Sequence, residues 1–170
     1  MRTFSFVLII FSIFVNTSTR AHAALKIGQA APHLVAPILD GSEFSMGAQA
    51  GKVVIIHFLA TWCTACTKEM PILNQFYVKH KKDVIMIGLS LDRPRDRKKV
   101  SELMHEVSFP LAMLNEAKTN EFGSPDTLPL TYLIDQQGLV RVIYGAGFSD
   151  LNDNTLTDAY NATLRPKVNK

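Results

Sequence analysis

The sequence predicts an α/β protein with a mixed central sheet flanked by helices. In the first half of the chain, two apolar runs with the character of buried strands stand on either side of a helical pattern. A helix between two strands indicates that the strands are parallel. In the second half, two strand-like runs are joined by a tight turn, which indicates an antiparallel hairpin. The two kinds of pairing together make the predicted sheet a mixed one.

The parallel unit begins after an entry segment with two prolines and a turn at Asp40-Gly41-Ser42. Residues 52–60 form an almost wholly apolar run, which predicts a strand buried on both faces. Residues 61–77 follow with apolar side chains at helical spacing, and Val84–Leu91 form the second buried run. These patterns predict a strand, a helix that carries Trp62–Cys66 near its start, and a parallel strand.

The second half of the chain completes the α/β pattern. Its elements, in order, are a charged helix over Pro94–Val107, a strand over Leu130–Ile134, a tight turn at Asp135–Gly138 and a strand over Leu139–Tyr144. Ser149 or Asp150 is expected to cap a last helix that runs to about Leu164, because serine and aspartate accept hydrogen bonds from the first amides of a helix.

The first 23 residues have the layout of a secretory signal peptide. An apolar run of 12 residues, Phe4–Val15, is followed by a polar stretch that ends at Ala21-His22-Ala23. Because a spanning helix needs about 20 apolar residues, we expect cleavage after Ala23, which leaves residues 24–170 as one domain. An uncleaved membrane anchor is the alternative, since Arg20 lies close to the cleavage site. In either case the domain is expected in an exporting compartment, where thiols meet oxidants.

Charge and length exclude several classes of protein. The chain carries 18 basic and 15 acidic side chains, and cleavage would remove Arg2 and Arg20 and leave the mature protein almost neutral. The sequence has no lysine or arginine cluster of the size that indicates nucleic-acid binding. A domain of this length buries enough surface to fold without a metal or disulfide to hold it together. No separate dimerisation segment is visible, so a monomer is expected.

Cys63 and Cys66, the two cysteines of the chain, lie where the first predicted strand turns into the helix. Unpaired amides and the partial positive charge at a helix N-terminus lower the pKa of a thiol. We therefore expect Cys63 to attack disulfides and Cys66, one turn on, to resolve the mixed disulfide. A structural bridge is one alternative, although a loop of two residues removes little entropy from the unfolded chain. A zinc site is another, although no second CxxC or HxxxH pair completes it.

Phe58–Pro71, with the sequence FLATWCTACTKEMP, resembles the active-site segment of the thioredoxin superfamily, in its exported TlpA/ResA-like branch. The resemblance extends from about residue 27 to residue 145. Gly28–Pro32 and Gly51–Val54 resemble the N-terminal extension that this branch shares with AhpC/TSA-like redoxins. Leu128–Gly138 resembles the later segment of the branch, in which a proline is cis.

The resemblance implies a thioredoxin-like fold with an N-terminal extension. It also implies a thiol-disulfide oxidoreductase that needs no cofactor beyond Cys63 and Cys66. Pro129 would be the cis proline that lies against the cysteine pair, where an extended substrate segment can pair. A simple strand-entry proline is the alternative for Pro129. Trp62 is expected to cover one side of the disulfide, and simple packing is a compatible alternative.

Two polar residues near the cysteines have two interpretations each. Glu69 lies three residues after Cys66, where the ResA-like branch carries a glutamate that adjusts cysteine protonation, and a solvated helix residue is the alternative. His57 lies six residues before Cys63, where thioredoxins proper carry a buried acid that accepts the proton of the resolving cysteine. A neutral imidazole could accept the same proton, but we favour a core histidine bonded to a backbone carbonyl.

The resemblance implies a periplasmic enzyme, either soluble or held at the inner membrane by its N-terminus. A membrane thiol donor would supply it with electrons, and it would reduce disulfides in exported proteins, with apocytochrome c as the best-known substrate class. The sequence leaves open whether the protein reduces or oxidises disulfides. A peroxiredoxin-like peroxidase is one alternative and would need a lone reactive cysteine. A Sco-type copper chaperone is another and would need cysteines three residues apart and a distal histidine, whereas no histidine follows His105.

Overall fold

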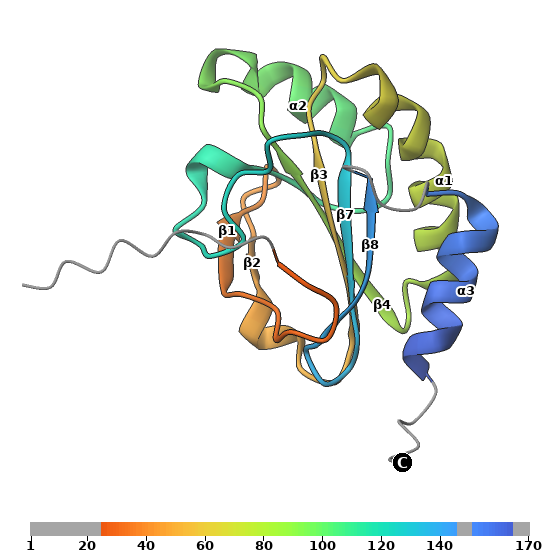
Figure 1. Cartoon of the computed structure of the whole chain (residues 1–170). Coiled ribbons are helices and arrows are strands. Elements are labelled where there is room, and N and C mark those ends of the chain that lie inside the picture. Colours follow the sequence, from red (N-terminus) through yellow and green to blue (C-terminus); the bar gives the residue numbers. More distant parts are fainter. Residues whose placement is uncertain (1–24, 146–150, 165–170) are drawn as a thin grey trace, which may run out of the picture.

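The computed structural model describes residues 25–145 and 151–164. The predicted signal peptide and the predicted caps Ser149 and Asp150 lie outside these residues. The main sheet has five strands in the order β5, β4, β3, β7 and β8 (Figure 1). The strands are β3 (Val53–Leu59), β4 (Val84–Ser90), β5 (Leu111–Met113), β7 (Leu130–Ile134) and β8 (Val140–Gly145).

β3 lies in the middle of this sheet, and all of its side chains are buried. It pairs in parallel with β4 and antiparallel with β7, and β8 pairs antiparallel with β7. The predicted mixed sheet is therefore confirmed, together with its parallel unit and its hairpin. The predicted turn closes the hairpin, because the Gly138 amide donates to the Asp135 carbonyl at 2.9 Å.

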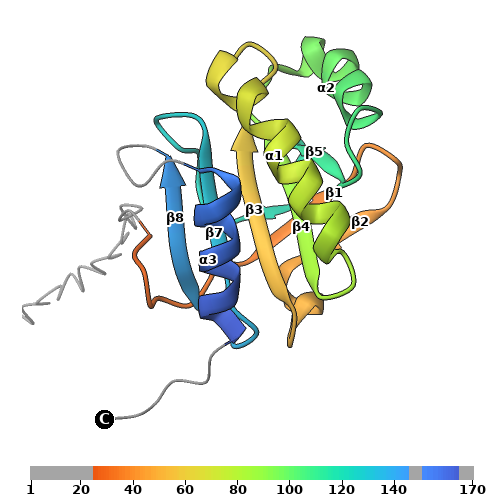
Figure 2. The ribbon, with the colours of Figure 1, turned by 90° about the vertical axis from the view of Figure 1, so that its right-hand side faces the viewer.

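Both faces of the main sheet are covered, which explains why its central strands are predominantly apolar. Figure 2 shows α1 (Thr64–His80) and α3 (Asp153–Leu164) side by side on one face. A second, three-stranded sheet covers the other face, in the order β2, β1 and β6. Its strands are β1 (Leu34–Pro37), β2 (Glu43–Ser45) and β6 (Thr119–Asn120).

Side chains of β3 alternate between two cores, as expected for a strand buried on both faces. Ile55 and Leu59 belong to the core beneath α1, which also contains Cys66. Ile56 and Phe58 belong to the core beneath the three-stranded sheet. By the same alternation, the side chain of His57 lies on the α1 side.

Four short strands are absent from the sequence prediction. β1, β2, β5 and β6 are only two to four residues long, too short to display a clear period of two. β1 and β2 pair antiparallel across the predicted turn at Asp40-Gly41-Ser42. Gly41 adopts a φ of +93° in this turn, which a residue with a side chain rarely adopts.

The second helix is shorter than predicted. α2 covers Arg97–Met104 and not Pro94–Val107, because its predicted first turn is a separate 3-10 helix. The amides of His105 and Glu106 bond to carbonyls three residues back. These bonds tighten the chain and end the helix before Val107.

The first and last helices begin later than predicted. α1 begins at Thr64, after a turn that leads out of β3. α3 begins at Asp153, because Asn152 Oδ1 accepts hydrogen bonds from the amides of Asn154 and Thr155, each at 3.1 Å. Asn152 therefore supplies the cap that was expected a few residues earlier.

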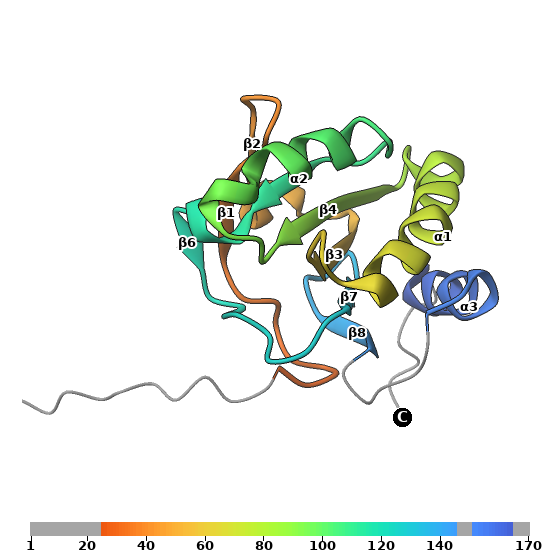
Figure 3. The same cartoon turned by 90° about the horizontal axis from the view of Figure 1, so that it is seen from above.

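One edge of the main sheet gathers the loops that carry the predicted site residues. Leu59 at the end of β3 pairs with Ser90 at the end of β4. Phe58 pairs with Leu130 at the start of β7. The loops after β3 and β4 and the residues before β7 therefore meet at this edge, which Figure 3 shows from above together with the start of α1.

Candidate active site

The two cysteines form a disulfide at the N-terminus of α1. Cys63 is the N-cap residue of the helix and Cys66 lies in its first turn, with 5.3 Å between their Cα atoms. The Cys66 amide donates a hydrogen bond to Cys63 Sγ at 3.1 Å. In the reduced protein, the same amide and the helix end would stabilise a thiolate on Cys63. The local geometry therefore suits a redox-active pair.

The two cysteines differ in their access to solvent. Cys63 is 8% exposed, whereas Cys66 is 1% exposed. Cys66 packs in the same core as Met70 and Leu73, which α1 buries against the sheet. An incoming disulfide would meet Cys63 first, which agrees with the expected order of attack.

The peptide bond between Leu128 and Pro129 is cis, as the resemblance implies, and it directly precedes β7. Gly145, the last residue of β8, pairs with Leu130 and lies against Pro129. A Cβ atom on Gly145 would lie 2.1 Å from the Pro129 carbonyl oxygen, and its φ is +84°. Only glycine suits this position, so Gly145 is a supporting residue of the site that the sequence analysis missed.

His57 is fully buried in β3, on the face that packs against α1. Its Nδ1 atom lies 2.8 Å from Oγ1 of Thr131 on β7. The expectation of a backbone carbonyl partner is therefore wrong, because a buried hydroxyl stands opposite the ring. Nε2 has no hydrogen-bond partner among the described residues. Burial lowers the pKa of His57 from 6.5 to about 3, so the imidazole is neutral at physiological pH.

Trp62 and Glu69 flank the cysteine pair along the chain. Trp62 is 69% exposed, so simple packing does not describe it, and its role as a cover for the disulfide stays a prediction. Glu69 lies one turn after Cys66 on α1 and is partly buried, with one carboxylate oxygen shielded from solvent. This environment argues against a fully solvated helix residue.

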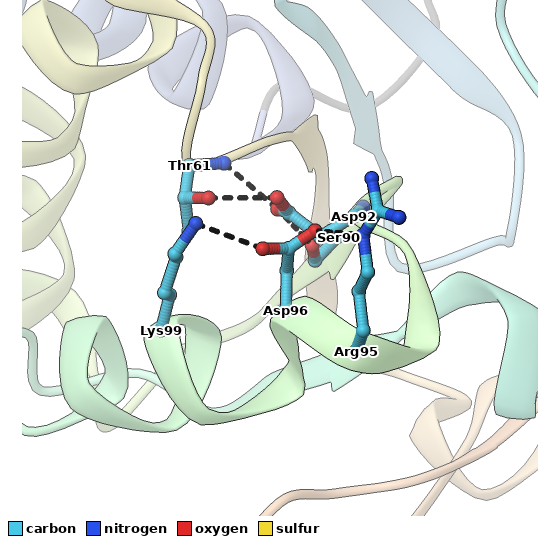
Figure 4. Close-up of polar contacts among 6 residues, drawn as sticks. All are labelled: Thr61, Ser90, Asp92, Arg95, Asp96 and Lys99. Atoms are coloured by element: carbon cyan, nitrogen blue, oxygen red, sulfur yellow. Dashed lines mark hydrogen bonds and ion pairs between the residues drawn. The ribbon is translucent and has the colours of Figure 1, made fainter.

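A carboxylate that the sequence analysis missed ties the loop after β3 to the end of β4. Asp92 is 2% exposed and accepts hydrogen bonds from the Thr61 amide at 2.8 Å, from Thr61 Oγ1 at 2.7 Å and from Ser90 Oγ at 2.7 Å (Figure 4). Thr61 lies two residues before Cys63, so Asp92 fixes the connection that carries the disulfide. The available signal was the polar pair Ser90 and Asp92 after an apolar strand, because α/β proteins place ligand-binding groups at the carboxyl ends of parallel strands.

The described residues show no second reactive centre of the kinds considered. Within residues 25–145 and 151–164, no three histidine, cysteine or carboxylate side chains gather so that they could hold a metal ion. No helix in the same part of the chain has the length and apolar character needed to cross a bilayer. The cysteine pair is the reactive group that this edge of the sheet presents.

Comparison with known proteins identifies the family to which the chain belongs. Residues 27–143 match the AhpC/TSA family. The chain belongs to this family. Thiol-disulfide oxidoreductase ResA of Bacillus cereus is 35% identical over 117 residues, which cover 68% of this chain and 68% of that relative. ResA of Geobacillus thermodenitrificans is 28% identical over 134 residues, which cover 78% of this chain and 76% of the relative.

A solved structure extends the likeness to the fold. The crystal structure of a thiol:disulfide interchange protein DsbE candidate from Chlorobium tepidum superposes with a TM-score of 0.69 at 26% identity, covering 83% of this chain and 99% of that chain. These likenesses confirm the predicted thioredoxin-like fold and the ResA/TlpA-like branch. This AhpC/TSA-family protein is a protein-disulfide oxidoreductase.

Proposed function

We propose that this enzyme is an exported reductant of protein disulfides, with Cys63 as its nucleophile and Cys66 as its resolving cysteine. The observation that carries the proposal is the disulfide at the start of α1, in which the sulfur of the more exposed cysteine accepts an amide hydrogen bond. A thiolate at Cys63 would be stabilised by this bond and by the helix end, and it would remain open to attack a substrate.

The reaction uses the two cysteines in turn. In the reduced enzyme, the Cys63 thiolate attacks one sulfur of the substrate disulfide, forms a mixed disulfide and releases the other substrate sulfur as a thiolate. Cys66 then loses its proton and attacks Cys63 Sγ, and the second substrate sulfur leaves. The enzyme ends with the disulfide between Cys63 and Cys66, which is the state described here. Overall, two electrons pass from the cysteine pair to the substrate, the Cys66 proton passes to a base, and the two substrate sulfurs leave as thiolates that take protons from solvent.

We propose that Glu69, and not His57, accepts the proton that Cys66 loses. Glu69 lies one turn further along α1, and one of its carboxylate oxygens is shielded from bulk water. Burial holds the pKa of His57 at about 3, which makes its imidazole a weak proton acceptor. The hydrogen bond between His57 and Thr131 serves instead to tie the strand before the cysteines to the strand after Pro129.

Pro129 marks the place where the substrate chain would lie. It stands directly before β7, at the sheet edge where the loop after β3 carries Cys63. An extended substrate segment can form backbone hydrogen bonds at such an edge while its disulfide is held at Cys63. The support for this role is the cis bond before Pro129 and the shared edge.

The N-terminal segment and the family support the proposed location and partners of the enzyme. The first 23 residues would direct it to the periplasm, where it is soluble or held at the inner membrane. A membrane thiol donor would keep the cysteine pair reduced, and the reaction needs no further cofactor. The resemblance to the TlpA/ResA-like branch favours apocytochrome c as substrate, and therefore a role in cytochrome c maturation. The enzyme would act as a monomer on exported proteins.

The first test is the reduction potential of the cysteine pair, measured in glutathione and dithiothreitol buffers. A value near about −270 mV, at the thioredoxin end of the range, supports a reductant. A value near about −120 mV would indicate disulfide formation and would overturn the reductant role. Cys66→Ser should trap a mixed disulfide with a substrate, and Cys63→Ser should not. Trapping by Cys63→Ser alone would reverse the roles of the two cysteines.

Two other functions considered from the sequence have separate tests. A peroxidase would consume hydrogen peroxide in a reaction that needs one cysteine alone, whereas the structure joins both cysteines in one disulfide. A copper chaperone would bind Cu(I) stoichiometrically through a histidine as well as both cysteines. We propose neither, because the relatives are thiol-disulfide oxidoreductases by name and the cysteine spacing suits disulfide exchange.

A further inference from the structure

An open depression lies beside Trp62, between the loop after β3 and the segment that leads into α2. Its volume is about 560 Å³, and it is lined by Thr61, Trp62, Asp92, Arg93, Arg95, Asp96 and Lys99. Trp62 is 69% exposed. Tryptophan is enriched among the residues that contribute most to binding interfaces. An exposed tryptophan next to a reactive cysteine therefore indicates a contact surface.

Cations outnumber exposed carboxylates around this depression. Arg93, Arg95 and Lys99 are exposed, and Asp96 is the half-buried carboxylate among them. Asp96 Oδ1 accepts a hydrogen bond from Lys99 Nζ at 2.8 Å, and Asp96 Oδ2 lies 3.8 Å from Arg95 Nε. Figure 4 shows Asp96 between these two cations. Arg93 forms no close ion pair with any residue that the structure describes, although its charge helps to lower the pKa of Asp96, so its guanidinium is available to a partner.

Asp92 holds the two walls of the depression in place. Its carboxylate bonds to Thr61 and Ser90 and is buried, so its oxygens are already occupied by three donors. Trp62 follows Thr61 in the chain and Arg93 follows Asp92. The tether therefore holds in place the backbone from which Trp62 and Arg93 extend before any partner binds. A surface that is ordered in advance loses less entropy when a partner docks.

We propose that the surface formed by Trp62, Arg93, Arg95 and Lys99 binds an acidic, extended segment next to the target disulfide of a substrate protein. The inference rests on the proposed function, because the segment reaches this surface when its disulfide is presented to Cys63. Carboxylates of the segment pair with Arg93 and Arg95, and an apolar side chain lies on the indole of Trp62. Charge complementarity of this kind raises the association rate and suppresses basic partners.

Three synthetic peptides test the proposal on the wild-type enzyme. They share one disulfide and differ only in the flanking residues, which are Glu-Glu, Gln-Gln or Lys-Lys. At low ionic strength, the reduced enzyme should react with the acidic peptide about 10-fold faster than with the basic one, with the neutral peptide between them. The ratio should fall toward one as salt is added, because salt screens exposed charges. Equal rates for the three peptides at low salt, or a preference for the basic peptide, would overturn the proposal.

A matched pair of variants distinguishes this surface from the net charge of the protein. Arg93→Glu/Arg95→Glu should abolish or reverse the preference for the acidic peptide. Lys81→Glu/Lys82→Glu makes the same change in net charge beyond the far end of α1, and it should retain the preference. Loss of the preference in both variants would overturn the docking surface. The wild-type comparison needs no variant, so it decides the proposal even if one variant does not fold.

A small neutral substrate separates failure of this inference from failure of the proposed function. Wild-type enzyme should reduce 2-hydroxyethyl disulfide, which carries no charged flanking residues that could pair with the cationic surface. Reduction of this compound without discrimination among the peptides would refute the docking surface alone. Failure to reduce either the compound or the peptides would refute the proposed function as well.

Discussion

Acidification from pH 7 to pH 4.5 should destabilise the protein through one buried residue, His57. Burial holds the pKa of native His57 at about 3, against 6.5 for an exposed imidazole. The unfolded chain therefore binds a proton below about pH 6.5 that the native state does not bind until about pH 3. Because the unfolded state binds more protons in this window, the stabilisation is complete above pH 6.5 and is lost as the pH falls toward 3.

The size of the effect follows from the two pKa values of His57. One pKa unit corresponds to about 1.4 kcal/mol. Between pH 7 and pH 4.5, the lower native pKa therefore removes about 2 to 3 kcal/mol from the free energy of unfolding. This is a substantial part of the roughly 5–15 kcal/mol by which a native domain is stabilised.

Urea unfolding at the two pH values, followed by far-ultraviolet circular dichroism, measures this loss for the oxidised protein. His57→Asn is the control, because an asparagine amide can stand opposite Thr131 Oγ1 as Nδ1 does, but it does not titrate. The wild type should lose about 2 to 3 kcal/mol more than the variant, since the other titrating groups are common to both proteins. Equal losses in the two proteins would refute the assignment of a neutral, buried His57.

Three further substitutions test the support of the cysteine loop. Asp92→Ala should lower the free energy of unfolding by about 3 kcal/mol, because Thr61 and Ser90 lose a buried, charged acceptor; a loss below about 1 kcal/mol in urea would show that the tether contributes little. Gly145→Ala should cost about 2–3 kcal/mol, because its Cβ would meet the Pro129 oxygen at 2.1 Å and its φ is positive. The matched change Gly47→Ala, whose Cβ would meet nothing closer than 3.9 Å, should alter stability by less than about 0.5 kcal/mol, and similar losses at both glycines would contradict the close approach at Gly145. Glu69→Gln should lower the thiol pKa values of the reduced cysteine pair, followed by the ultraviolet absorbance of the thiolate, because a nearby carboxylate opposes thiolate formation; an unchanged titration curve would make Glu69 a bystander.

The features that the sequence predicted well are those that depend on short, local sequence patterns. β3, β4 and β7 are predominantly apolar runs of five to seven residues, and the cysteine pair is a short motif at a strand-to-helix junction. Pro129 was identified from the resemblance of its surrounding segment, and its cis bond is confirmed. β6, with two residues, offers no such pattern, because its strand character comes from pairing with β1.

The contacts that the sequence did not reveal join residues far apart in the chain. Thr61 and Asp92 are 31 residues apart, and His57 and Thr131 are 74 residues apart. Each pair meets because neighbouring strands end or cross at the same level of the sheet, which depends on strand order and register. The sequence shows that His57 lies within an apolar run, but the identity of its partner follows only from the pairing of His57 with Thr131 across β3 and β7.

The position of Trp62 determines which changes in the protein alter its intrinsic fluorescence. It is the single tryptophan of the chain, and its indole is already in contact with water in the native state. Unfolding therefore changes the solvent around this indole very little. The disulfide one residue away is, by contrast, an efficient quencher of excited indole. The intrinsic fluorescence of this protein should increase when the cysteine pair is reduced. It should change very little when the oxidised protein unfolds.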